Sequence, residues 1–317
     1  MTRHLLTSCT AAALTLAAAG TARADGEAAT PNKGMNQVNA SVQRDELHNQ
    51  LGLATLGLAV SERGWVRLGG GQSRSEQAGT MQRPSIASAA LGWLGDGWQL
   101  SGGATQRRDG ARLRQTDWMS SLEWRPTGAV LGADLMHRSA HAEGTVSTTA
   151  QGGTANLPVA EDIRGNGVGL HGALQLSERL QLFGAGMRYH NRVTATQNGA
   201  ATGSASGLPG VVDGLLGNQA LLAQTLLSRA SAVTRDEAVL DHSAQVGASY
   251  RVNDQLAFTG EYLVDKVQAG GDTLHSVQVK AAFGFANLWT LTPTVGRSHS
   301  GQAGGVNYGA LSIAYGW

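Results

Sequence analysis

The sequence predicts an all-β protein, an antiparallel up-and-down β-barrel of about fourteen strands that crosses a membrane. Segments of ten or more residues alternate apolar and polar side chains, which is the period of a strand with two different faces. Very short and longer connections separate these segments in turn, as in barrels whose hairpins end on opposite sides of a membrane. Six of the 7 tryptophans stand beside short connections or at the last residue, where indole rings favour a membrane boundary.

The composition fits a barrel better than a helical membrane protein. Mean hydropathy is -0.16 and aromatic residues make up 5% of the chain, which a barrel tolerates because only alternate strand residues face lipid. No apolar run after the N-terminal region reaches the roughly 18 residues that a spanning helix needs. A soluble β-sandwich or solenoid is the alternative; it would share the 44 glycines but would not require a ring of tryptophans.

Residues 1–24 have the pattern of a secretory signal peptide. Arg3 and His4 precede an apolar core over 11–20, and Ala22-Arg23-Ala24 forms a small-x-small cleavage site. The only cysteine lies within this leader, so we expect neither disulfides nor thiol chemistry in the mature protein.

Removal of the leader changes the charge balance slightly. It takes away Arg3 and Arg23 and leaves 22 of the 24 basic residues against 23 acidic ones. We therefore expect no nucleic-acid partner, because phosphate backbones are bound by a concentrated basic face. Residues 25–34 are expected to form a short periplasmic tail, too short for a plug domain.

The expected strands fill residues 35–317 without an intervening linker. They are 35–45, 50–61, 65–75, 83–94, 98–107, 112–125, 129–142, 163–177, 180–195, 241–252, 255–268, 273–286, 288–301 and 306–317. Short turns follow every second strand, which places both ends of the chain on the periplasmic side. The first strand is polar along its length, and twelve or sixteen strands are the alternatives.

The last strand has an alternating pattern that ends on an aromatic residue. Leu311, Ile313, Tyr315 and Trp317 are expected to face outward, with small residues between them. Together with the leader and the strand repeat, this pattern resembles the C-terminal assembly signal of the Gram-negative outer-membrane β-barrel superfamily, which includes the porins. The resemblance implies the cell outer membrane as location and the barrel insertion machinery as a partner during assembly. It identifies no specific family and implies no channel residues.

Two sets of side chains are expected to face the membrane boundary and the lumen. The girdle at the membrane interface comprises Trp65, Trp93, Trp98, Trp124, Trp289 and Trp317. The charged residues expected to line the lumen are Arg67, Asp117, Glu123, Asp134, Arg138, Arg188, Arg251, Glu261, Asp265 and Lys280. Their mixed signs argue against a strongly ion-selective pore, and ion pairs that merely stiffen the wall are the alternative interpretation.

The connection 197–240 is the irregular part of the pattern. After a flexible stretch and Pro209 it carries a helical stripe at i, i+3 and i+4 spacing, formed by Val212, Leu215, Leu216, Leu222, Leu226 and Leu227. About twenty helical residues would span roughly 30 Å. We expect this loop to be extracellular and to act as a plug or lid, or else to pack on its own rim. The other long outer loop, 143–162, is rich in Thr, Gly and Ala and is expected to be simply mobile.

A different class of function follows from three residues near the extracellular rim. His137 and Ser139 share an outward face, and Asn166 is expected outward on the adjacent strand. A serine activated by a histidine that a third polar group orients is the logic of acyl transfer. The His-x-Ser spacing resembles that of outer-membrane phospholipase A and lipid A deacylase, although the rest of the phospholipase signature is absent. A polar rim that contacts lipopolysaccharide headgroups is the alternative.

The sequence therefore predicts an outer-membrane channel for passive passage or export of small polar molecules. Its expected partners are outer-membrane lipids and lipopolysaccharide, the insertion machinery and a small polar solute; no cofactor or metal site is expected, because the nine histidines are scattered. A lipid hydrolase and a surface adhesin or structural barrel are the alternative functions. The oligomeric state is not defined by the sequence.

Overall fold

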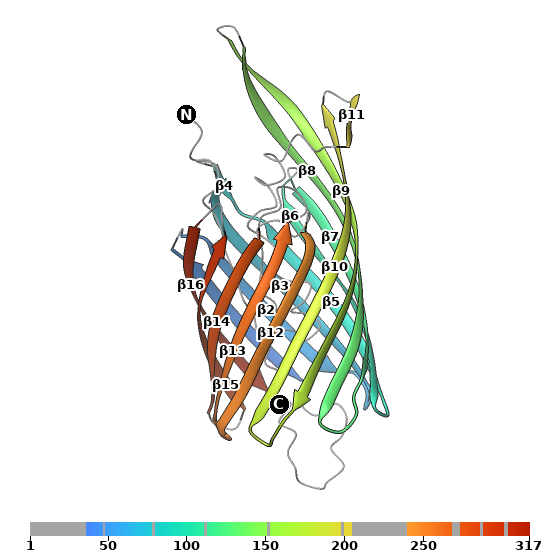
Figure 1. Cartoon of the computed structure of the whole chain (residues 1–317), viewed down its shortest axis with the longest axis vertical. Coiled ribbons are helices and arrows are strands. Elements are labelled where there is room, and N and C mark those ends of the chain that lie inside the picture. Colours follow the sequence, from blue (N-terminus) through green and yellow to red (C-terminus); the bar gives the residue numbers. More distant parts are fainter. Residues whose placement is uncertain are drawn as a thin grey trace.

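The chain forms one closed antiparallel barrel. The computed structural model describes residues 36–46, 48–77, 80–110, 113–150, 153–197, 200–204, 240–267, 273–285, 288–300 and 304–317. These residues form a barrel wall of fourteen strands (Figure 1). The predicted signal peptide, the 25–34 tail and the helical stripe within 212–227 lie outside the described residues.

The barrel strands follow one another around the wall in chain order. They are β1 (Gln37–Asp45), β2 (Gln50–Ala59), β3 (Gly64–Gln77), β5 (Ser85–Gly95), β6 (Trp98–Asp109), β7 (Leu113–Trp124), β8 (Ala129–Ala150), β9 (Gly153–Gln175), β10 (Leu180–Gln197), β12 (Leu240–Asn253), β13 (Leu256–Val267), β14 (Thr273–Phe285), β15 (Trp289–Ser300) and β16 (Gly304–Gly316). The fourteen-strand prediction is confirmed, and neither a sandwich nor a barrel of twelve or sixteen strands describes the wall. Among the described residues no helix is long and apolar enough to cross a membrane.

The polar first strand closes the barrel. β1 pairs with β16 on one side and with β2 on the other. Its inward side chains Asn39, Ser41 and Gln43 are buried, whereas Val38 and Val42 are exposed on the outer face. Its low hydrophobicity follows from this division, because the inner face carries hydrogen-bonding groups and the outer face needs only alternate apolar residues.

The two ends of the barrel differ in their connections. The short turns that follow β2, β5, β7, β9, β12 and β14 all lie at one end, which we call the short-turn end (Figure 1, bottom). Gly97 and Gly128 lie in two of these turns with φ of 77° and 75°, a left-handed conformation that glycine adopts without the strain of a Cβ.

At the opposite end, the structure differs from the sequence-based expectation in two connections. The segment 143–162 is not a simple loop, because β8 and β9 continue beyond the rim as a hairpin paired as far as Ala150 and Gly153 (Figure 1). The β-branched residues Thr145, Val146 and Thr148 favour this extended conformation. The connection 197–240 begins with a short strand, β11 (Ala200–Ser204), which pairs with β10. A second short strand, β4 (Thr80–Gln82), pairs with β3.

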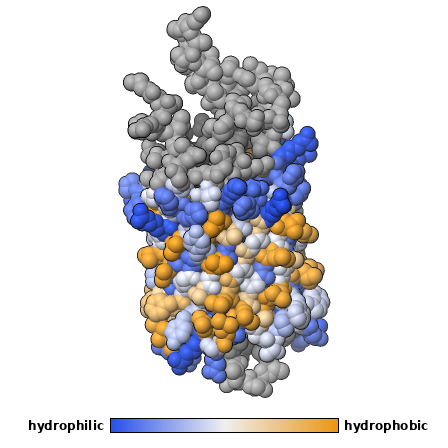
Figure 2. All heavy atoms as spheres, in the orientation of Figure 1, coloured by the Kyte–Doolittle hydropathy of each residue, from blue (hydrophilic) through white to orange (hydrophobic). Residues whose placement is uncertain are grey.

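The outer face carries an apolar band. Figure 2 shows hydrophobic side chains gathered around the wall, with hydrophilic side chains above and below them. Leu135, Val168 and Leu170 are among the exposed apolar residues of this band. Such a band is what the hydrocarbon core of a bilayer requires of a barrel wall.

Inward rings cover glycines on the inner face. Trp65 lies over Gly92, Phe183 over Gly247, His171 over Gly132 and Tyr308 over Gly296, and in each pair the two residues are direct cross-strand partners. A Cβ at any of these glycines would overlap the ring. Glycine in these strands therefore provides the space for a ring against the curved wall.

Candidate functional site

Most of the charged residues predicted for the lumen lie on the inner face of the wall. Arg251 is half-buried on that face, and eight others are buried: Arg67, Asp117, Glu123, Asp134, Arg138, Glu261, Asp265 and Lys280. Arg188 is the exception and needs correction. It is exposed and pairs with the exposed Val168, while its neighbour Met187 is buried on the inner face. The alternation of β10 therefore puts Arg188 outside.

One interior cluster joins β7 and β8 toward the long-connection end. Arg138 Nε donates to Asp117 Oδ1 at 2.7 Å and Arg138 Nη2 donates to Oδ2 at 3.1 Å. Gln115 Nε2 also donates to Asp117 Oδ2, at 2.8 Å. Both charged side chains are almost fully buried. The fork of the guanidinium thus satisfies the carboxylate in a bidentate pair, the geometry in which a buried charge is tolerated.

A second cluster surrounds His171 nearer the short-turn end. Its Nδ1 lies 3.0 Å from Asp134 Oδ2 and its Nε2 lies 3.2 Å from Glu123 Oε1. Arg125 Nη2 donates to Glu123 Oε2 at 2.7 Å. The imidazole therefore links two carboxylates on neighbouring strands, and Gly132 leaves room for its ring.

An apolar patch separates these two polar clusters. Met119, Met136 and Met187 form a buried group against which Tyr189 packs. Gly167 lies beneath it, and a Cβ there would come within 3.1 Å of Met187 Sδ. Methionine adapts its shape to irregular space, so this patch is an adaptable apolar surface between the two polar clusters.

A third cluster lies on the other side of the barrel, on β12, β13, β14 and β16. Lys280 Nζ donates to Glu261 Oε1 at 2.6 Å, and Gln245 Nε2 donates to Glu261 Oε2 at 3.2 Å. Gln278 Nε2 donates to the same oxygen, and Tyr308 OH donates to Gln278 Oε1 at 3.2 Å. The Glu261 carboxylate therefore has one cation and two amides beside it.

Sequence reasoning did not assign His171 or Tyr308 to the interior. The alternation of β16, with Leu311 and Ile313 outward, already puts Tyr308 on the inner face. Neither the aromatic character of Tyr308 nor the scattered positions of the histidines indicated which of these residues face the interior. Pairing of His171 with Gly132 is visible only once the strand register is known.

Of the six tryptophans expected in the girdle at the membrane interface, five lie on the outer face of the wall and Trp65 does not. Trp93, Trp98, Trp124, Trp289 and Trp317 are all exposed. Trp65 is 2% exposed and lies inside, where the Arg67 guanidinium stands 5.4 Å from its ring centroid. Because Trp65 and Arg67 are two residues apart in one strand, they share a face, and an inward Arg67 requires an inward Trp65.

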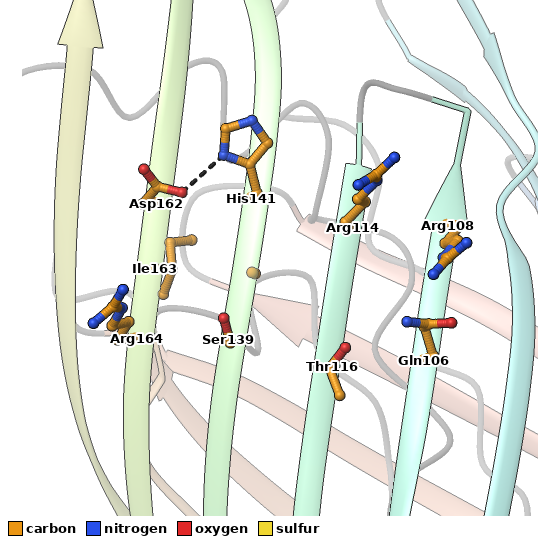
Figure 3. Close-up of a pocket in the computed structure, with 10 residues that line it drawn as sticks. Gln106, Arg108, Arg114, Thr116, Ser139, His141, Asp162, Ile163 and Arg164 are labelled. Carbon is orange, nitrogen blue, oxygen red and sulfur yellow. Dashed lines mark hydrogen bonds and ion pairs between the residues drawn. The ribbon is translucent and has the colours of Figure 1, made fainter.

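The outer wall of β6–β9 contains a polar pocket of about 290 Å³ near the long-connection end (Figure 3). The side chains that point outward around it are Gln106, Arg108, Arg114, Thr116, Ser139, His141, Asp162 and Arg164. His141 Nδ1 lies 2.8 Å from Asp162 Oδ1 and its Nε2 lies 3.3 Å from Glu143 Oε1. The pocket therefore collects polar groups on a surface that faces away from the lumen.

The three residues of the alternative catalytic hypothesis lie beside this pocket. His137 Nδ1 lies 2.9 Å from Asn166 Oδ1, because the two residues are direct partners across β8 and β9. Ser139 is exposed on the same face of β8, two residues further on. In the part of the chain that the structure describes, Ser139 forms no hydrogen bond with His137. The structure thus brings together the histidine and the asparagine, and places the serine on the same face.

No metal centre emerges from the charged clusters. Within the described ranges no group of three or more His, Cys, Asp and Glu side chains could hold a metal ion.

Comparisons with solved structures agree with the fold. The chain is similar to a structure described as "CymD monoaromatic hydrocarbon channel", with a TM-score of 0.54 and 9% identity over 90% of this chain and 89% of that chain. A Pseudomonas aeruginosa FadL homologue gives a TM-score of 0.52 and 9% identity over 88% of each chain. The chain therefore has the fold of the outer-membrane β-barrels, and the predicted resemblance to that superfamily is confirmed at the level of the fold.

The comparisons go no further than the fold. Neither protein-family models nor curated proteins give a match. At 9% identity the two structures share the barrel fold with this chain. The function of each is a property of that protein and not of this chain.

Proposed function

We propose that this protein is an outer-membrane channel for passive passage or export of small polar molecules. The observation that carries the proposal is the polar inner face, in which hydroxyls, amides and neutralised charges line a wall of fourteen strands. A barrel of this size lies between those filled by their own side chains and the open porins of sixteen strands. We assign the short-turn end to the periplasm, as in bacterial barrels.

Paired charges favour a polar solute of low net charge. Asp117 is paired with Arg138 and Glu261 with Lys280. At these positions the wall therefore presents hydrogen-bonding groups rather than an excess of positive or negative charge. The fold shared with a structure described as a hydrocarbon channel supports a transport role. The methionine patch gives a passing molecule one apolar surface, which suits solutes with a small apolar part.

Single-channel recording of the refolded mature protein in planar bilayers tests the proposal. The inner side chains are shielded from solvent in this structure, so we expect small or intermittent conductance from the intact chain and larger steps after deletion of residues 203–234. That deletion also tests the predicted plug or lid in 197–240. Silence of both proteins, with folding verified by heat-modifiable gel mobility, would refute a channel.

The second candidate function is lipid hydrolysis at the outer wall. The 2.9 Å contact between His137 and Asn166 favours it, because it would orient the imidazole as the base for Ser139. The pair faces outward, where lipid ester bonds would be accessible.

Release of fatty acid from phospholipid and from lipid A vesicles tests this candidate. Hydrolysis should fall at least about a hundredfold in Ser139→Ala and in His137→Ala, and less in Asn166→Ala. Ser120→Ala is a matched control, because Ser120 is also an exposed outward serine of the same wall. Wild-type protein without hydrolysis, or equal loss in Ser120→Ala, would eliminate the enzyme.

A further inference from the structure

The outer wall of β6, β7, β9 and β10 carries four arginines close to the long-connection end. Arg108, Arg114, Arg164 and Arg192 are all exposed and point away from the lumen. Figure 3 shows Arg108 and Arg114 side by side, and Arg164 beyond Ser139. We call these four residues the arginine patch.

The arginines of the patch face one another across strands. Arg108 is the direct partner of Arg114, and Arg164 is the direct partner of Arg192. Like charges directly opposite each other on a sheet are destabilising. Two such pairs on one surface therefore need negative charge nearby, which either the protein itself or a bound ligand would have to supply.

The protein provides little of that counter-charge. Among the described residues none of the four guanidinium groups forms an ion pair. Asp162 is the acidic residue that lines the same pocket, and its Oδ1 lies 2.8 Å from His141 Nδ1. Glu143 contacts the same ring at 3.3 Å. The patch therefore keeps an excess of positive charge.

An aromatic and polar row and then a partly aliphatic row follow the patch toward the short-turn end. One row toward the short-turn end, Trp118, His137, Asn166 and His190 follow one another across β7–β10. In the following row Leu135 and Val168 are partners and are 59% and 62% exposed. On β7 and β8 the outward side chains thus change from the Arg114 guanidinium through the Trp118 indole to the aliphatic Leu135, in the order in which a lipid changes from headgroup to acyl chain, whereas on β10 the exposed Arg188 stands beside Val168.

We propose that the arginine patch binds the phosphorylated headgroup of an outer-leaflet glycolipid of the lipid A type. Guanidinium groups bind phosphate through two parallel hydrogen bonds, and each arginine pair would take one phosphate. The acyl chains would lie against Trp118, Leu135 and Val168. A soluble anion could meet the charges but would leave this apolar band without a contact.

The spacing of the two pairs fits a headgroup with a phosphate at each end. The midpoints of the β6–β7 and β9–β10 pairs are separated by three interstrand steps, or about 14 Å across the strands, and by two residues, or about 7 Å, along them. Between them lie Thr116 and Ser139, which are direct partners and offer hydroxyls to a sugar. A disaccharide with a terminal phosphate on each sugar matches this arrangement.

Native mass spectrometry of the detergent-solubilised protein with added bis-phosphorylated lipid A tests the inference. The double variants Arg108→Gln/Arg114→Gln and Arg164→Gln/Arg192→Gln should each weaken binding about tenfold or more. Arg44→Gln/Arg297→Gln removes two exposed outward arginines from β1 and β15 on the far side of the barrel, and should change binding less than twofold. Equal weakening in this control would refute a local site.

Three further measurements identify the ligand. Monophosphorylated lipid A should bind several-fold more weakly than the bis-phosphorylated lipid, and excess inorganic phosphate should displace neither. Displacement by inorganic phosphate at the same concentration as lipid would mean that the patch is a simple anion site. The bound lipid A should be recovered in the mass spectrum with all its acyl chains, which separates this inference from the hydrolase candidate; the inference does not depend on the channel.

Discussion

Arg138 and Asp117 face each other across β8 and β7 and form a bidentate pair inside the wall, with Nε to Oδ1 at 2.7 Å. Both side chains are removed from solvent, so water does not compensate for the loss of either partner. Removing one partner leaves the other as an uncompensated buried charge, which is more costly than removing both.

We therefore expect Asp117→Asn to destabilise the barrel by about 3–5 kcal/mol. The double variant Asp117→Leu/Arg138→Met should lose less than Asp117→Asn, because it leaves no buried charge. Reversible urea unfolding in lipid vesicles, followed by tryptophan fluorescence, gives the free energies of unfolding. A double variant less stable than the single one would show that the pair itself contributes the stability.

The glycine beneath His171 leads to a second prediction. A Cβ at Gly132 would overlap the imidazole, so Gly132→Ala should displace the ring from Asp134 and Glu123. We expect a loss of about 1–3 kcal/mol in the free energy of unfolding.

Gly260→Ala is the matched control for this substitution. No atom lies within 4 Å of a Cβ at Gly260, so alanine should be neutral or should stabilise the strand by about 0.5–1 kcal/mol. Similar losses in the two variants would mean that the contact with His171 is not the cause.

The fold was predictable because its signals are local. Alternation in a strand such as 273–286 is a property of neighbouring residues, and the short turns are fixed by a few glycines and polar residues. The sequence therefore predicts the strand number and, in the last strand, the outward position of Leu311 and Ile313, both of which are exposed.

The interior and the loops depend on partners that are distant in sequence. The ring of Trp65 fits inside because Gly92 in the next strand leaves space for it, whereas the outward position of Arg188 follows from the local alternation of β10. The paired continuation of β8 and β9 replaces a predicted loop because each strand supplies the hydrogen bonds of the other. The contact between His137 and Asn166, which are 29 residues apart in the sequence, likewise depends on the register between β8 and β9.

The pairing of Lys280 with Glu261 predicts the direction of a change in ion selectivity. Lys280→Gln removes the cation and leaves the carboxylate of Glu261 on the inner face. An uncompensated charge near a permeating ion in water is worth about 1 kcal/mol at 4 Å, so the permeability ratio of K⁺ over Cl⁻ should rise by up to about fivefold.

Reversal potentials in a KCl gradient measure this ratio. Arg188→Gln also removes one positive charge, but from the outer face, and should leave the reversal potential unchanged. A shift toward Cl⁻ in Lys280→Gln, or equal shifts in both variants, would be incompatible with a conducting path along this part of the wall.

The connection between β1 and β2 predicts a pH effect at the seam of the barrel. The Glu46 carboxylate accepts hydrogen bonds from the Asn307 backbone N–H at 3.0 Å and from its Nδ2 at 2.6 Å. These two bonds, with a smaller contribution from the charge of Arg297, lower the pKa of Glu46 below its ordinary value of 4.5. Since the folded state lowers this pKa, the contact is complete above pH 4.5 and is lost as the pH falls through the lowered value.

Carbon-13 NMR of the Glu46 carboxyl carbon measures this titration in the refolded protein. We expect a midpoint below 4.5 in the wild type and a return toward 4.5 in Asn307→Ala, which keeps the backbone donor but removes the side-chain donor. The protection of the Asn307 amide against hydrogen exchange should fall at the same midpoint, because its acceptor is then protonated. A wild-type midpoint at or above 4.5 would show that Glu46 does not fasten β16 to the connection between β1 and β2 in solution.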